Sequence, residues 1–154
     1  MRDKRFIAEH RDGPLKKEQH YQLITWAYDC AEHILYLFGE KIDERLKNAL
    51  HVAKAWKQGT ASVGDARKVA VDAHAVVRES SNPTAIAVAR SVGHAVATAH
   101  MADHSLGAAL YALKALKNAG KSTASERKWQ DEKLPSEIKE LVLTARRRFG
   151  RGEA

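Results

Sequence analysis

Apolar residues recur three and four positions apart along most of this 154-residue chain, and that spacing constrains its fold more than any other feature. It places apolar side chains on one face of an α-helix, whereas a half-buried strand needs strict alternation, which is almost absent here. We therefore predict an all-α fold, a compact single-domain bundle of about seven helices. The expected helices span about 15–38, 43–58, 62–80, 83–101, 106–119, 125–133 and 136–149.

The most apolar stretch, residues 83–119, carries small or apolar residues on almost every side of the helix. A helix that is apolar all round is typically enclosed by its neighbours, so we expect this Ala- and His-rich segment to form the buried centre of the bundle. Neither a proline nor a clear breaker divides it, and it could be one helix or two. We predict a turn near residues 102–105.

The charge is concentrated at the two ends of the chain. We expect residues 1–154 to form a single helical domain with short basic tails at about 1–14 and 150–154. Residues 1–17 contain six Lys and Arg against three Asp and Glu, residues 146–154 contain four against one, and the body contains sixteen against fifteen. A protein that follows a phosphate backbone should draw cations from its folded core elements. The net charge of +7 therefore argues only weakly for a nucleic-acid partner, which we do not expect.

The single cysteine, Cys30, permits neither an internal disulfide nor a paired-cysteine zinc motif. It falls on the apolar face of the first predicted helix, where a small buried residue is expected rather than a reactive thiol. The basic start is not followed by an apolar stretch long enough for a signal peptide, and no run approaches the length of a membrane span. We expect a cytoplasmic protein with no membrane partner.

Three histidines, His94, His100 and His104, fall within eleven residues and are the most unusual polar feature of the sequence. Helical projection places His100 on the apolar side, so we expect it to be buried. If the helix were continuous, His100 and His104 would lie one turn apart, a spacing at which two imidazoles can reach one metal ion. Asp103 supplies a carboxylate beside them. His74, at the edge of an apolar helix face, could extend this polar cluster.

Two interpretations of the cluster are open. In one, neutral histidines hydrogen-bond across a crowded interface, because leaving a buried polar group unpaired costs about 1–3 kcal/mol. In the other, they bind a metal ion or act as a general acid or base. We favour the first, and we assign no catalytic residue, no metal ligand and no cofactor. The residues of this predicted structural seam or candidate binding site are Asp29, His74, His94, His100, Asp103 and His104.

Several short motifs are spread over most of the chain. They are Trp26-Ala27 with Asp29-Cys30-Ala31-Glu32, Ala55-Trp56, Asp65-Ala66-Arg67 with Ala73-His74-Ala75, Gly93–His104, Ala108–Lys114, and Glu126-Arg127 with Trp129-Gln130 before Leu134-Pro135. The block Gly93–His104 is the most specific. In these motifs the chain resembles the immunity-protein-5-like putative immunity proteins of bacterial polymorphic toxin systems.

The resemblance implies an all-α protein that binds and neutralises a cognate toxin, and it brings no catalytic residues with it. It also implies that His100 and His104, beside Asp103, belong to a shared core or ligand seam. We therefore predict a non-catalytic protein whose partner is a toxin, and a small homo-oligomer is compatible with the sequence. Two alternatives are a metal- or histidine-dependent hydrolase that uses His74 with these three residues, and a nucleic-acid-associated accessory protein.

Overall fold

A computed structural model describes residues 2–153, with side chains for residues 2–148. The predicted all-α bundle is confirmed: the described part forms seven α-helices and three short 3-10 helices. The side chains of the predicted basic tail at about 150–154 lie outside the described residues. The helices are η1 (Lys4–Phe6), η2 (Glu9–Arg11), α1 (Lys17–His33), η3 (Leu35–Phe38), α2 (Glu44–Lys57), α3 (Val63–Glu79), α4 (Pro83–Ala97), α5 (His104–Asn118), α6 (Thr123–Glu132) and α7 (Ser136–Glu153).

Local capping interactions define where several helices begin. The Asp43 carboxylate accepts a hydrogen bond from the backbone N–H of Arg45 at the start of α2. Ser62 and Asp65 form a capping box at the start of α3, in which each side chain accepts from the other residue's backbone N–H. Asn82 caps α4, where proline occupies the first turn. These contacts satisfy N–H groups that have no partner within the helix.

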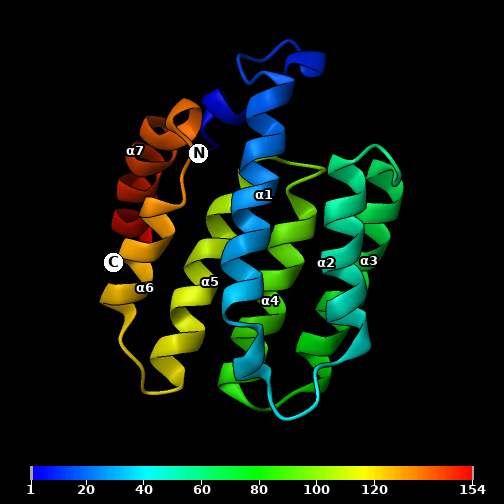
Figure 1. The fold of residues 1–154 in the computed structure, drawn as a ribbon, viewed down its shortest axis with the longest axis vertical. Coiled ribbons are helices and arrows are strands. Elements are labelled where there is room, and N and C mark those ends of the chain that lie inside the picture. Colours follow the sequence, from blue (N-terminus) through cyan, green and yellow to red (C-terminus); the bar gives the residue numbers. More distant parts are fainter. Residues whose placement is uncertain (1, 154) are drawn as a thin grey trace.

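The helices are arranged around α4 and α5, as predicted for the Ala-rich segment. In Figure 1, α1 crosses in front of α4 and α5, α2 and α3 lie on one side, and α6 and α7 lie on the other. The larger apolar cluster contains residues of all five helices from α1 through α5. A second cluster joins α1, α5 and α7 to the N-terminal segment. Among the described residues, no helix is both long and apolar enough to cross a membrane.

Residues 83–119 form two helices, and the first ends at Ala97 rather than at the predicted Met101. Short-range bonds replace the α-helical pattern there: the N–H of Ala99 donates to the carbonyl of Val96 at 3.2 Å, and that of His100 donates to Ala97 at 3.0 Å. The next helix begins at His104. The turn therefore starts earlier than the predicted 102–105, and His100 and His104 do not share a helix.

The N-terminal segment, residues 2–12, folds against the bundle. The N–H of Leu15 donates to the carbonyl of Ile7 at 3.0 Å, and the N–H of Glu9 donates to the carbonyl of Leu15 at 2.8 Å. Phe6 enters the second apolar cluster and is only 4% exposed. Much of the predicted N-terminal basic tail is thus ordered on the body of the protein.

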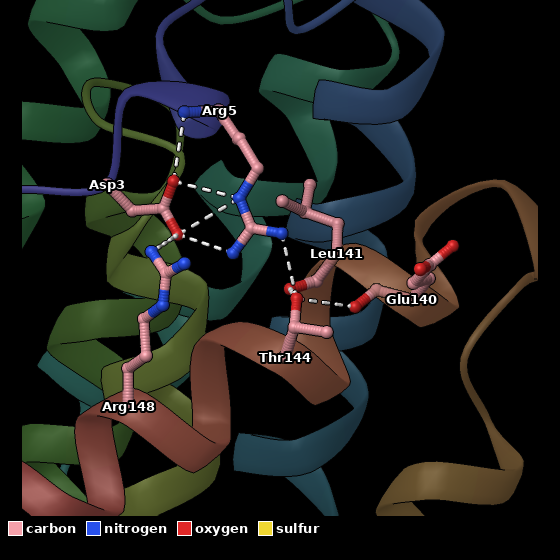
Figure 2. Close-up of polar contacts among 6 residues, drawn as sticks. All are labelled: Asp3, Arg5, Glu140, Leu141, Thr144 and Arg148. Atoms are coloured by element: carbon pink, nitrogen blue, oxygen red, sulfur yellow. Dashed lines mark hydrogen bonds and ion pairs between the residues drawn. The ribbon is translucent and has the colours of Figure 1, made fainter.

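Polar contacts also join this segment to α7 (Figure 2). Arg5 Nη1 donates to Thr144 Oγ1 at 2.8 Å, while Arg5 Nη2 donates to Asp3 Oδ2 at 2.6 Å. Arg148 Nη1 lies 3.8 Å from the same Asp3 oxygen. The two basic ends of the sequence therefore meet in space, and the Asp3 carboxylate is shared between two guanidinium groups.

Gly13 allows the N-terminal segment to pack closely, because a Cβ at this position would overlap the backbone carbonyl of Ile7. We expect Gly13→Ala to detach the segment, to lower the free energy of unfolding by about 2 kcal/mol and to speed tryptic cleavage after Arg5 and Arg11. Limited proteolysis and thermal unfolding measure these effects. Gly64→Ala is the matched control, since its Cβ would meet Ser62 Oγ at an ordinary 3.6 Å. Equal cleavage rates for the two variants would contradict the prediction.

Candidate functional site

Two histidines from neighbouring helices face each other at the centre of the candidate site. His94 on α4 and His104 on α5 place their Nδ1 atoms 3.1 Å apart, a hydrogen-bonding distance. In this contact one Nδ1 must carry a hydrogen and the other must offer a lone pair, because two protonated nitrogens cannot bond to each other. The geometry thus requires that at least one of the two rings is neutral. We call these two residues the histidine pair.

Next to the histidine pair lie the aromatic ring of Tyr111 and two cationic side chains. The rings of His94 and Tyr111 are nearly parallel, with their centroids 5.2 Å apart and an interplanar angle of 18°. Arg90 Cζ and Lys114 Nζ lie 5.7 and 5.0 Å from the Tyr111 ring centroid, so two cations sit against its π-system. Tyr111 therefore holds the His94 ring between α4 and α5.

Gly107 provides the space that the His94 ring occupies. A Cβ added to Gly107 would lie 2.6 Å from His94 Nδ1 and 2.8 Å from its Cγ, both closer than real Cβ atoms approach. Nearby, Ser91 Oγ donates to the carbonyl of Ala108 at 2.7 Å, which shows how closely α4 and α5 approach. Gly107 thus makes room for the partly buried imidazole of His94.

The surroundings of the histidine pair oppose its protonation. Burial is the main cause that lowers the pKa of His94 to about 4, and the nearby His104, His74 and Arg90 add to it. Burial also lowers the pKa of His104, although Asp103 acts in the opposite direction. The neutral form of both rings is therefore favoured at pH 7, and two neutral rings that share this hydrogen bond must be opposite tautomers.

The other predicted seam residues lie around the histidine pair or away from it. His74, exposed on α3, is near enough to influence His94. Asp103 accepts from Arg2 Nε at 2.8 Å at the protein surface. Asp29 lines a separate cavity of about 240 Å³ between α1 and α2, where burial raises its pKa. His100 is only partly buried, not buried as predicted, because α4 ends before reaching it.

Three of the four residues of the hydrolase alternative have different neighbours. His104 points to His94, Asp103 pairs with Arg2, and His100 lines another cavity. Among the described residues, no group of three or more His, Cys, Asp or Glu side chains is arranged to hold a metal ion. Cys30 is fully buried, and burial raises the pKa of its thiol well above the usual value.

His20 is a buried histidine that the sequence interpretation missed. Its Nε2 lies 2.6 Å from the carbonyl oxygen of Thr98, so this nitrogen must carry the hydrogen. Its ring packs on Trp56 with centroids 4.9 Å apart. The register of α1 contained a signal for this position, because His20 precedes the buried Leu23 and Ile24 by three and four residues. The hydrogen bond from His20 to Thr98 connects α1 to the turn between α4 and α5.

A second buried polar network, also missed, links α1, α5, α6 and α7. Arg146, only 8% exposed, donates to Gln130 Oε1 at 2.6 Å and to Asp131 Oδ1 at 3.0 Å. Gln130 Nε2 donates to the carbonyl of Ala109 at 3.1 Å, and Trp26 Nε1 donates to the carbonyl of Gln130 at 2.8 Å. These bonds satisfy a buried cation and hold α7 on the bundle.

Comparison with known proteins gave one family match. The family model described as Imm-5 like putative immunity protein matches residues 13–137. No curated protein and no solved structure matches the chain. The matched region includes α1 to α6 and both members of the histidine pair, whereas residues 2–12 lie before it.

Proposed function

The chain belongs to the Imm-5 like putative immunity protein family, and we propose on that basis that it binds a cognate bacterial toxin and holds it inactive without catalysing a reaction. The observation that carries this proposal is the match across residues 13–137, which spans six of the α-helices. Protection by binding requires a stable folded surface and no reactive group. We propose that it takes place in the cytoplasm of the producing cell.

The internal contacts of the histidines support a structural role for the seam. His94 bonds to His104, His20 bonds to the Thr98 carbonyl, and His33 Nδ1 bonds to the Glu126 carboxylate at 2.7 Å. Each contact joins one ring nitrogen to a residue on another segment of the chain, so these histidines contribute to the packing between helices. We propose that the histidine pair stabilises the α4–α5 interface, on which the partner-binding surface is built.

Co-expression with any toxin that is encoded directly upstream of the gene tests the proposal. We expect this chain to restore growth of a bacterium that expresses the toxin, and the two proteins to co-elute as a defined complex in size-exclusion chromatography with light scattering. Failure of the folded chain to protect the cell or to form the complex would overturn the proposal.

A matched variant tests the hydrolase alternative in the same experiment. His74→Ala removes an exposed imidazole of the proposed hydrolase set and should keep both the fold and the protection. Loss of protection by a variant that melts like the wild type would support the hydrolase. Metal analysis adds an independent readout, because stoichiometric bound zinc, iron or manganese would favour that alternative.

A further inference from the structure

A cavity of about 390 Å³ lies where the N-terminal segment crosses the turn between α4 and α5. We call it the N-terminal cavity. Arg2, Lys4 and Arg11 contribute cationic side chains to its lining, which also includes His10 and His100 but no Asp or Glu. A pocket of this volume can enclose one or two side chains of a partner. The composition of the lining favours an anionic occupant.

Three carboxylates near these cations, those of Asp3, Glu9 and Asp103, make contacts of their own. Asp3 is held between Arg5 and Arg148, as Figure 2 shows, and Glu9 Oε1 accepts from the backbone N–H of Lys17 at 3.0 Å. Asp103 pairs with Arg2 at the rim. They leave two lining cations, Lys4 and Arg11, without a carboxylate partner among the described residues.

The lining of the N-terminal cavity is also partly apolar. Arg11 Nη1 contacts Met101 Sδ at 3.6 Å, and Ile7, which also lines the cavity, is 37% exposed. The positive potential reaches His100, since burial and the charges of Arg67, Arg11 and Arg2 lower its pKa. A suitable ligand must therefore be acidic and must also bury apolar surface.

We infer that the N-terminal cavity grips an acidic segment of the protein partner, in which Asp or Glu residues flank one large apolar side chain. The apolar side chain would cover Ile7 and Met101, while the carboxylates would pair with Lys4 and Arg11. This inference rests on the proposed function and names the surface that would hold the toxin. The cations Arg2, Lys4 and Arg11 lie before the matched region, so family membership alone does not account for them.

The same observations disfavour a nucleic acid. Binding to a phosphate backbone is driven by an extended row of cations, whereas these cations line a single, partly apolar cavity. Base stacking is strongest on a large accessible aromatic ring, but Phe6, the one Phe, Tyr or Trp residue of the cavity lining, is only 4% exposed. An acidic protein segment satisfies both the charge and the apolar character.

Synthetic peptides test the inference on the full-length protein. We expect acetyl-Glu-Asp-Phe-Asp-Glu-amide to bind about tenfold more tightly than its neutral analogue with Gln and Asn, or than the analogue with Gly in place of Phe. NMR titration should shift the backbone amides of Arg11, His100 and Met101. Equal affinities for the three peptides, or shifts confined to another surface, would overturn the inference.

A charge-matched pair of variants locates the site. Lys4→Gln/Arg11→Gln should weaken binding of the acidic peptide about tenfold, because it removes the two unpaired cations. Lys41→Gln/Lys68→Gln removes the same charge from exposed positions elsewhere and should not change it. Thermal unfolding confirms that both variants are folded. Equal losses in the two variants would show a non-specific charge effect and overturn the site.

Two further arms separate the possible failures. If wild type neutralises the toxin and Lys4→Gln/Arg11→Gln does so with equal affinity, the cavity inference fails while the proposed function stands. If wild type binds the acidic peptide at the cavity but does not protect against the toxin, the proposed function fails. Single-stranded DNA and phosphatidylserine vesicles test the other classes of partner. If either binds more tightly than the peptide, and Lys4→Gln/Arg11→Gln abolishes that binding, the cavity binds that class of partner and the inference of an acidic protein segment fails.

Discussion

Replacing Gly107 with alanine is expected to lower the free energy of unfolding by about 2 kcal/mol, although alanine normally favours a helix over glycine. The added Cβ would lie 2.6 Å from His94 Nδ1 and must displace the ring. That displacement removes the contact with His104 and disturbs the stacking on Tyr111. Chemical denaturation of the purified variant measures the change.

Two comparisons separate this clash from a general effect of substituting a buried glycine. Gly93→Ala, in the interior of α4, should stabilise by about 0.5–1 kcal/mol, since its Cβ would meet Ala73 Cβ at an ordinary 3.5 Å. In the background His94→Ala, the cost of Gly107→Ala should fall by about 1 kcal/mol or more. Additive effects, or destabilisation by Gly93→Ala as large as by Gly107→Ala, would contradict the geometry of the pair.

Acidification from pH 6.5 to 4.5 is expected to remove about 2 kcal/mol of stability through His94. The pKa of His94 is about 4 in the folded chain and near 6.5 when unfolded, so the unfolded state takes up its proton first. This contribution is therefore complete above pH 6.5 and is lost as the pH falls toward 4. The lowered pKa values of His20 and His104 act in the same direction.

The pH window separates histidines from carboxylates. The pKa values of Asp3, Asp43 and Glu79 are lowered by hydrogen bonds to Arg5 and Arg45, so their contributions are lost from about pH 5 downward and mostly below the range in which His94 acts. Unfolding by urea at a series of pH values should show a smaller slope for His94→Gln than for wild type between pH 6.5 and 4.5. An unchanged slope would show that His94 already accepts a proton in the folded protein.

The helices could be predicted because their signals are local. Asp43, Ser62 and Asn82 each cap a helix through a backbone N–H two or three residues further along the chain, and the periodic apolar residues form the buried face of that helix. The predicted burial of Cys30 followed from the same periodicity and is confirmed. Such features depend on neighbours within one or two turns, which the sequence contains directly.

The candidate site could be predicted only in part, because its contacts join distant segments. The histidine block contains the histidine pair, but His104 contacts His94 and not His100, because this depends on where α4 ends and how α5 packs on it. The charge pattern marked the N-terminal residues as a tail, whereas Phe6 packs into the core and folds them over the bundle. The N-terminal cavity arises from that packing.

Titration of a fixed amount of active toxin with the purified chain would test the proposed mechanism of protection most directly. If the chain acts by binding alone, inhibition should reach its endpoint at a fixed, stoichiometric ratio of chain to toxin and should not increase with further incubation. Progressive loss of toxin activity at substoichiometric amounts of the chain would show turnover, and it would contradict a non-catalytic immunity protein.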